Sequence, residues 1–454
     1  METAKMLTIL VFALSMMVCQ AQLGEAAAMS TTFNPLSTDS DSFLTVRETI
    51  GPLPAPIVTG NSVELCLNSR YSQHTLSGTA SNQQLSNVLY GAGKAPITGV
   101  YRNIYVATQT ATYLYDPNNH SLSWYSDEVT DQGAFVISYD RELAFDAGVS
   151  YMPAFLASVS LWESTESAVS SCPKGTKVYF GVQGVRGFTP ELVARSSVPE
   201  GEPGWLPDPS TTGENSVEVV LANLNYVDSF DQTNLTLQQI SQILWAGYGC
   251  TPHTTSNGRA GLTVPSAFAN YYLTGTIYLA NENGVYRYHN RNPSTDLTTR
   301  DHRIEQISSD DVRGGLQSAV SGLPQAPCYV ILCLDSSYVG RYAHLETGFV
   351  ASNMLIQASA IGLGCHFKTE LTSGEQGSIQ TATSIPSSDI PQVVVSIGPI
   401  CVEFEDYARF AEYWIEKDCS GLNNWCDGAD FEPDGDVDWN DLQRFVAKWL
   451  TCCQ

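Results

Sequence analysis

The sequence has little positive charge and no long apolar run beyond its N-terminus. Its 454 residues include 22 Lys and Arg against 47 Asp and Glu, which gives a formal net charge of −25. Such a balance argues against nucleic acid and against anionic membrane surfaces as partners, because both would repel the chain. No later stretch reaches the roughly 18 apolar residues that a transmembrane helix needs. We therefore expect no membrane span in the mature chain.

Common catalytic motifs are also missing. The sequence has no G-x-S-x-G, no H-E-x-x-H, no P-loop and no G-x-G-x-x-G, and its seven histidines are scattered. A hydrolase therefore has no support from motifs. We expect a lone histidine such as His253 or His366 to be structural rather than a metal ligand.

The N-terminus resembles a secretory signal peptide over residues 1–28. Lys5 precedes an apolar run from Met6 to Val18, and small residues follow at Ala21 and at positions 26–28. The run is short for a membrane helix, although an uncleaved anchor is the alternative. The mature protein is therefore expected to be exported to the periplasm or outside the cell.

Twelve cysteines are present, and five of them lie in the last 54 residues. That density predicts a small disulfide-stapled domain in an oxidising compartment, with zinc as the alternative, although no C-x-x-C pair supports zinc. These five are Cys401, Cys419, Cys426, Cys452 and Cys453. Six others lie among apolar residues and are expected to be buried packing thiols: Cys66, Cys172, Cys250, Cys328, Cys333 and Cys365.

Several sequence blocks occur twice in the same order. "QQLSNVLYGAG" (83–93) and "QQISQILWAGYG" (238–249) both predict an amphipathic helix, and "IYVATQTATYLY" (104–115) and "IYLANENGVYRY" (277–288) both predict a strand, a turn and a strand. Two further pairs are an apolar helix after an acid-x-Gly start (145–162 and 345–364) and a closing apolar strand (177–185 and 391–398).

The repeated blocks indicate an internal duplication. We predict two copies of one α+β domain, at residues 45–195 and 213–400. The segment between them, 196–212, is rich in Pro, Gly, Ser and acidic residues and is expected to be a linker.

With these blocks in order, the second copy resembles the nitroreductase superfamily, and most closely its SagB-type dehydrogenases. The residues that carry the resemblance are "ISQILWAGYG", "GRAGLTVPSA" (258–267), "GVYRYH" (284–289), "ASNMLIQASAIGLG" (351–364) and "IPQVVVSIG" (390–398). The resemblance implies a mixed α+β fold, a dimer that holds FMN at its interface, and hydride transfer through the flavin. A tandem copy further implies a pseudo-dimer folded from one chain.

The same resemblance implies a set of cofactor-binding residues. Arg70 and His74 belong to the first copy's equivalent of a phosphate-binding run, whereas the second copy has no cation at 225–229. Phe268 replaces a family glycine in the turn near the flavin. We therefore expect one mixed site, with Arg70 facing the Ser266 region. The full set is Arg70, His74, Arg259, Pro265, Ser266, Ala267, Gly362 and Gly364.

Residues 401–454 are predicted to form a small all-α module that binds calcium. "VEFEDYARFAEYWI" (402–415) recurs 35 residues later as "VDWNDLQRFVAKWL", and an acidic loop precedes the second copy. Its oxygen donors follow the spacing of an EF-hand-like dockerin repeat, with Gly435 at the sharp turn. They are Asp430, Glu432, Asp434, Asp436, Asp438 and Asp441. A solvated acidic loop is the alternative, and the dockerin resemblance implies a cohesin-like or cell-surface partner.

Together these features predict an exported FMN-dependent oxidoreductase that acts on a small molecule. The alternative from a different functional class is a catalytically inactive duplicated scaffold, which would serve in binding or surface assembly through its dockerin-like module.

Overall fold

A computed structural model describes most of the chain from residue 60 onward. The described residues are 60–71, 82–96, 104–107, 111–127, 134–138, 144–160, 163–172, 175–185, 203–255, 257–290, 300–401, 404–419, 426, 428–431 and 434–452. The predicted signal peptide, His74 and Glu432 lie outside them.

The first half contains helices and two small antiparallel sheets. Its elements are α2 (Val63–Ser69), α3 (Asn82–Lys94), β1 (Tyr105–Ala107), β2 (Thr112–Asp116), β3 (Ser121–Ser126), β4 (Ala134–Ser138), α4 (Ala144–Ser160), β5 (Glu163–Cys172) and β6 (Gly175–Val185). The strands pair in the orders β1-β2-β3 and β4-β6-β5.

The second half is built on a six-stranded sheet. Its elements are α5 (Val217–Ala222), α6 (Leu237–Tyr248), β7 (Cys250–Thr254), β8 (Ala260–Leu262), η1 (Ala267–Ala269), β9 (Ile277–Asn281), β10 (Gly284–His289), β11 (Arg303–Ser308), α7 (Arg313–Ala319), β12 (Cys328–Asp335), α8 (Arg341–Ala360), β13 (Leu363–Lys368), α9 (Ser373–Thr383) and β14 (Asp389–Pro399). The sheet order is β11-β10-β9-β12-β14-β13, and all its pairs are antiparallel.

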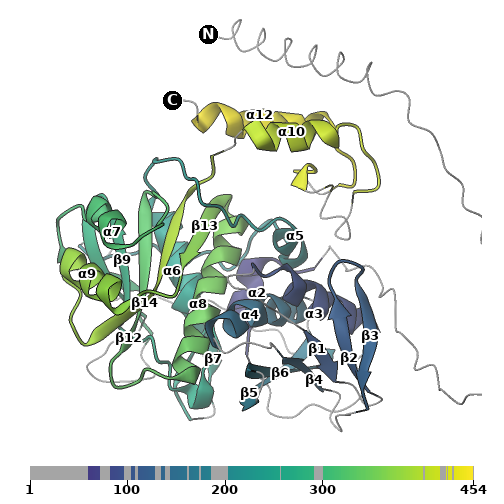
Figure 1. The fold of residues 1–454 in the computed structure, drawn as a ribbon, viewed down its shortest axis with the longest axis horizontal. Coiled ribbons are helices and arrows are strands. Elements are labelled where there is room, and N and C mark those ends of the chain that lie inside the picture. The colour runs from purple at the N-terminus through teal and green to yellow at the C-terminus, as the bar shows by residue number, and fades with distance from the viewer. Residues whose placement is uncertain are drawn as a thin grey trace, which may run out of the picture.

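Helices cover both faces of this sheet (Figure 1). Alternate residues of β9 point to opposite sides: Ile277 and Leu279 join the core around α6 and α8, whereas Tyr278 and Ala280 join the cluster under α7 and α9. A strand buried on both faces needs apolar residues along its buried length, and residues 277–280 of β9 and 328–334 of β12 supply them.

The two halves are joined through their matching helices. Helix α4 packs along α8, and Ser62 pairs with Ser216 in an isolated antiparallel bridge at the starts of α2 and α5. Each of these serines also caps its own helix, since Ser62 Oγ accepts from Leu65 N–H and Ser216 Oγ accepts from Val219 N–H. Equivalent positions of the two halves therefore face each other.

The predicted repeat blocks adopt the expected elements. The two helices of the opening blocks are α3 and α6, and α6 begins with a capping box between Thr236 and Gln239. The strand-turn-strand blocks are β1–β2 and β9–β10, and the long apolar blocks are α4 and α8. The sequence patterns did not predict α7, α9 or β11–β13.

The C-terminal module, residues 401–454, contains helices α10 (Phe404–Glu412) and α12 (Trp439–Cys452), which lie side by side in Figure 1. The rings of Phe410 and Phe445 stack with centroids 5.2 Å apart. Tyr90 and Ala222 belong to the same apolar cluster, so the module packs on the rest of the chain.

Cysteine usage agrees with the sequence where the chain is described. Cys419 and Cys426 form a disulfide inside the C-terminal module. Five of the predicted packing thiols are buried: Cys66, Cys250, Cys328, Cys333 and Cys365. Among the described residues, no helix combines the length and the apolar character that crossing a membrane would require.

Candidate functional site

Arg70 reaches from the first half of the chain into the second. It follows α2 directly and is 2% exposed. Its Nη2 donates to the backbone oxygens of Leu262, at 3.0 Å, and Val264, at 3.3 Å. The guanidinium also lies over the ring of Phe155, 5.1 Å from the centroid. Arg70 is therefore fixed at the junction of α2, α4 and the strand β8.

Two further donor nitrogens of Arg70 make no hydrogen bond that the described residues provide. Within the part of the chain that the structure describes, its buried Nε and Nη1 have no hydrogen-bond partner. Burial lowers the pKa of Arg70 to about 10, so the side chain remains charged at neutral pH. An unpaired buried charge is costly, and a bound anion with two acceptor oxygens would satisfy both donors. This orphaned guanidinium fits a phosphate-bearing cofactor.

The segment after β8, residues 265–273, is called the Ser266 turn here. Arg259 Nη1 donates to the backbone oxygens of Ala269, at 2.7 Å, and Asn270, at 3.1 Å. Ser266 Oγ accepts from Tyr271 N–H at 2.8 Å. Arg259 therefore braces the Ser266 turn with this nitrogen, and the turn is the element that Arg70 approaches.

The Ser266 turn has an unusual backbone. Phe268, Ala269 and Tyr271 have φ angles of 57°, 51° and 55°, a region that residues other than glycine rarely adopt. The Phe268 side chain is 82% exposed. Phe268 thus adopts a left-handed backbone where the resemblance expects a glycine, and its ring lies in solvent rather than inside the protein.

A buried carboxyl lies beneath this turn. Glu346, on α8, is 1% exposed, and its Oε1 accepts from the Tyr248 hydroxyl. Tyr248 in turn accepts from Leu273 N–H at 3.0 Å. Burial raises the pKa of Glu346 to about 7, against the opposing effect of the nearby Ser266 and Tyr248 hydroxyls. Sequence reasoning missed Glu346, although an acid inside an apolar helical block was the signal.

The predicted site residues fall into two groups. Arg70, Arg259 and residues 265–267 surround the Ser266 turn, near the middle and N-terminal part of α8. Gly362 and Gly364 follow the other end of this helix, which is about 30 Å long. Gly364 packs there against Val227, Phe230 and Ile400. The structure therefore does not bring these glycines to Arg70, and His74 lies outside the described residues.

The two halves share a buried Ser–His–Tyr arrangement that sequence reasoning did not predict. In the first half, hydrogen bonds join His120 to Ser86 and to Tyr115, both at 2.8 Å. In the second half, His302 is joined to Ser241 at 2.7 Å and to Tyr288 at 2.8 Å.

These histidines lie in the core. His302 is completely buried, and burial lowers its pKa to about 3, so the imidazole stays neutral at physiological pH. Each trio joins the first repeated helix to the second strand of the repeated hairpin. The hydrogen bonds therefore hold α3 to β2 and α6 to β10. Because the histidines are buried, they are unsuited to proton transfer with a substrate that arrives from solvent.

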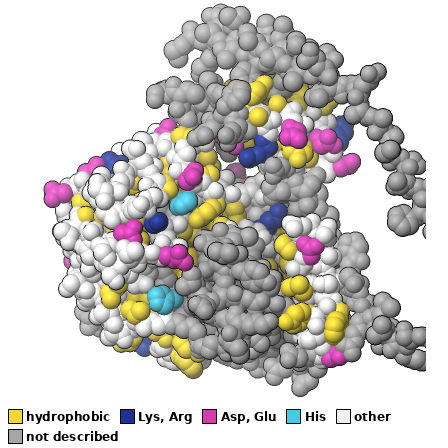
Figure 2. Space-filling model, in the orientation of Figure 1, with side chains coloured by type: hydrophobic (Ala, Val, Ile, Leu, Met, Phe, Trp, Pro, Cys, Tyr) yellow, Lys and Arg dark blue, Asp and Glu magenta, His cyan; other side chains and the backbone are white. Residues whose placement is uncertain are grey.

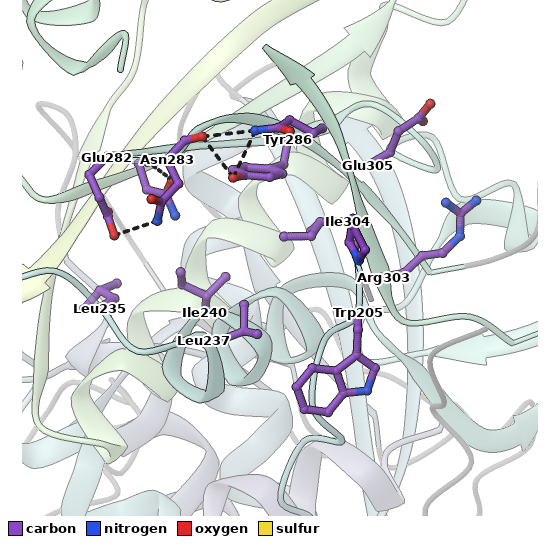
Figure 3. A pocket seen from close by; sticks show the side chains of 14 residues that line it. Trp205, Leu235, Leu237, Ile240, Glu282, Asn283, Tyr286, Arg303, Ile304 and Glu305 are labelled. Carbon is purple, nitrogen blue, oxygen red and sulfur yellow. Dashed lines mark hydrogen bonds between the residues drawn. The ribbon is translucent and has the colours of Figure 1, made fainter. Parts of the chain in front are cut away.

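A cavity of about 460 Å³ lies at the N-terminal end of α6, away from Tyr248 at its C-terminal end. Figure 3 shows the Trp205 ring, Leu237, Ile240 and Ile304 around an apolar floor, with Tyr286 and the Asn283 side chain at the rim. A second hollow, of about 550 Å³, separates the C-terminal module from the second half and includes Gly362 in its lining. Figure 2 shows basic side chains beside that hollow.

The acidic loop of the C-terminal module is partly described. Asp430 Oδ2 accepts from Gly435 N–H at 3.0 Å, and Asp441 accepts from Phe431 N–H at 2.6 Å and Asp438 N–H at 2.8 Å. Gly435 has a φ of 103°, as the sharp turn requires.

The acidic residues of this loop do not converge on one point within the described residues. Asp434 Oδ1 accepts from Asp436 N–H at 3.1 Å, and no group of three or more His, Cys, Asp or Glu among the described residues is close enough to hold a metal. Asp430 is fully buried, and its Oδ1 has no hydrogen-bond partner there. The predicted donor Glu432 is outside the described part.

Comparison with known proteins places these features in context. No protein-family model matches the chain. A Methanocaldococcus jannaschii protein assigned as a nitroreductase is 32% identical over 168 residues, which are 33% of this chain and 77% of that protein.

Two solved structures are similar to parts of this chain. One, from Anabaena variabilis and also assigned as a nitroreductase, matches with a TM-score of 0.50 and 14% identity over 80% of this chain and 97% of that one. An FMN-dependent nitroreductase from Clostridium difficile matches with a TM-score of 0.29 and 13% identity, over 40% of this chain and 87% of its own.

Proposed function

The chain belongs to the nitroreductase family, and from this membership we propose that it is an exported FMN-dependent oxidoreductase acting on a small molecule. The observation that carries the proposal is the buried Arg70, whose Nε and Nη1 have no partner among the described residues. The export part rests on the N-terminal sequence alone. The substrate is a small molecule that accepts or gives up hydride at the flavin.

The proposed site is formed between the two halves of one chain. Three features support an internal duplication that folds as a pseudo-dimer: the paired Ser62 and Ser216, the packed helices α4 and α8, and the recurring Ser–His–Tyr trios. The solved structure from Anabaena variabilis supports the same view, because its match covers 80% of this chain and so cannot lie within one half.

Different residues of this chain would bind different parts of the cofactor. Arg70 would bind the phosphate through Nε and Nη1, while Nη2 keeps its bonds to Leu262 and Val264. The Ser266 turn, braced by Arg259, would offer backbone to the cofactor. When bound, FMN would supply the hydride chemistry, and the protein would supply binding and orientation.

Only one such site is proposed per chain. The aligned run of the second copy begins at Asn225, whose Nδ2 donates to Leu363 O at 3.1 Å. Asp228 in the same run would repel a phosphate. The pseudo-symmetric counterpart of the Arg70 site therefore lacks the cation that a flavin phosphate needs.

An FMN titration of the mature chain and of Arg70→Ala tests this function. We expect the wild type to quench flavin fluorescence on binding and the variant to lose at least tenfold in affinity. Arg287→Ala is the control, because Arg287 contacts Tyr278 and Asp389 on the sheet face covered by α7 and α9. Equal FMN binding by wild type and Arg70→Ala would remove the proposed site, and a wild type that binds no FMN would support the inactive scaffold.

A second proposal concerns the C-terminal module. The buried Asp430, with Oδ1 unpaired among the described residues, and the left-handed Gly435 favour one calcium ion in the 430–441 loop. The dockerin resemblance then points to a cohesin-like or cell-surface partner. Because Tyr90 and Ala222 pack into the module's apolar cluster, such a partner would bind the surface that the rest of the chain leaves open.

A further inference from the structure

Three residues of the Ser266 turn are held in a backbone region that costs energy. Phe268, Ala269 and Tyr271 all have φ between 51° and 57°. This backbone is unfavourable for residues other than glycine, so the conformation persists only if its surroundings impose it. The sequence offers no glycine at these positions to relieve the cost.

Neighbouring residues hold the Ser266 turn in this backbone conformation through contacts to its carbonyl groups and to its amide groups. On one side, Arg259 Nη1 binds the Ala269 and Asn270 oxygens, and Asn257 Nδ2 donates to the Phe268 oxygen at 3.0 Å. These contacts come from the β7–β8 hairpin that precedes the turn. They fix the backbone carbonyls of the turn but leave its amide groups to other partners.

The backbone amides of Tyr271 and Leu273 are hydrogen-bonded to hydroxyl groups that lie next to the Glu346 carboxyl. Leu273 N–H donates to the Tyr248 hydroxyl, which donates to Glu346 Oε1. Tyr271 N–H donates to Ser266 Oγ, and the Ser266 hydroxyl lies beside the same carboxyl. Glu346 therefore accepts a hydrogen bond from the Tyr248 hydroxyl, which binds the turn, and adjoins a second hydroxyl of the turn, that of Ser266.

Burying Glu346 in the core would be unfavourable without a purpose. A carboxyl that is 1% exposed, with no basic partner in the described part of the chain, costs free energy that an apolar residue at this position of α8 would avoid. Its second oxygen, Oε2, makes no hydrogen bond among the described residues. Packing of α8 alone therefore does not explain why a carboxyl is present at this position.

We propose that Glu346 is a positioning residue for the cofactor: through Tyr248 and Ser266 it holds the Ser266 turn in the left-handed conformation in which the turn meets the flavin. The inference rests on the proposed function, because it assigns a role within the same site. Glu346 does not touch the cofactor in this scheme. It acts through the two hydroxyls that it binds or adjoins.

The test compares Glu346→Met, which removes the acceptor oxygens at similar length, and Tyr248→Phe with the wild type by two measurements. The first is the FMN dissociation constant. The second, made without flavin, is hydrogen exchange of the segment that contains the Tyr271 and Leu273 amides. We expect each variant to weaken FMN binding at least tenfold and to speed exchange in this segment at least tenfold. The double variant should bind no more weakly than the Glu346 variant alone, because Tyr248 acts through Glu346.

Ser352→Ala is the matched control, since Ser352 is equally buried on α8 but donates to Val149 O on the side of α4. It should leave both measurements unchanged. FMN binding by the wild type with an unchanged constant in both variants would overturn this inference alone. Unchanged exchange in the segment would overturn it too. A wild type that binds no FMN would overturn the proposed function and this inference together.

Discussion

Gly148 of α4 and Gly348 of α8 meet where the two long helices cross. A Cβ added to Gly148 would lie 2.2 Å from the Leu345 oxygen, and one added to Gly348 would lie 2.2 Å from the Phe145 oxygen. The relationship is reciprocal, as at the axis of a symmetric dimer, in which residue i contacts j and j contacts i. Here the reciprocity lies within one chain, which is what a duplicated domain folded as a pseudo-dimer requires.

Gly148→Ala should strongly destabilise the chain, because its methyl group would meet backbone atoms that cannot rotate away. We expect a loss of about 3 kcal/mol in the free energy of unfolding, measured by urea denaturation. The control is Gly377→Ala in the exposed part of α9, where a Cβ would meet nothing within 4 Å. That change should stabilise by about 0.5–1 kcal/mol. Equal effects of the two substitutions would show that the α4–α8 crossing is looser than described.

Phe268→Gly should have a higher free energy of unfolding than Phe268→Ala, which is the reverse of the usual order. Glycine normally costs about 0.5–1 kcal/mol relative to alanine, because it loses more backbone freedom on folding. At a φ of 57° we expect the order to reverse, with the glycine variant about 1 kcal/mol more stable in urea denaturation. An alanine variant that is the more stable of the two would mean that the turn is not left-handed at this residue.

The stability of the chain should depend on pH through Glu346. Burial raises the pKa of Glu346 from 4.5 to about 7. The folded state therefore holds a proton that the unfolded chain has released, so this contribution is complete below pH 4.5 and is lost as pH rises through 7. Between pH 4 and pH 8, Glu346→Gln should gain roughly 3 kcal/mol relative to the wild type in urea denaturation. Parallel pH profiles would contradict a raised pKa at this carboxyl.

Asp430→Asn should weaken calcium binding by the C-terminal module. The substitution removes one charge from the ligand set of the proposed loop, so we expect at least a tenfold loss of affinity in calorimetric titration of the full chain. Glu412→Gln, an exposed change at the end of α10, should leave the affinity unchanged. Failure of the wild type to bind calcium at all would return the loop to a solvated acidic turn.

The sequence predicted the elements whose residues visibly recur in both halves, and it missed α7, α9 and the strands β11–β13. The period of "QQISQILWAGYG" and the alternation of "IYLANENGVYRY" are local signals, and α6 and the β9–β10 hairpin confirm them. Helices α7 and α9 occur only in the second half of the described chain and have little apolar periodicity, so no pattern indicated them.

The candidate site also contains residues that the sequence predicted and residues that it did not. The juxtaposition of Arg70 with residues 262–264 was expected from the idea of a mixed site, because a pseudo-dimer brings one copy's arginine to the other copy's turn. Glu346 and Tyr248 were not foreseen, since they are far apart in sequence and meet only through packing. For Gly362 the motif match predicted a place in the cofactor site. In the structure this glycine instead lines the hollow beside the C-terminal module.

The number of FMN molecules bound per chain tests the proposed single mixed site most directly. The mature chain would be incubated with excess FMN and desalted, and the flavin absorbance near 450 nm (roughly, a property of the cofactor) would be compared with the protein concentration. The predicted ratio is one, because in the proposed pseudo-dimer the aligned run of the first half carries the buried Arg70, whereas residues 225–229 of the second half include no cation. A ratio of two would contradict the single mixed site, and a colourless, folded protein would contradict the flavin-dependent function itself.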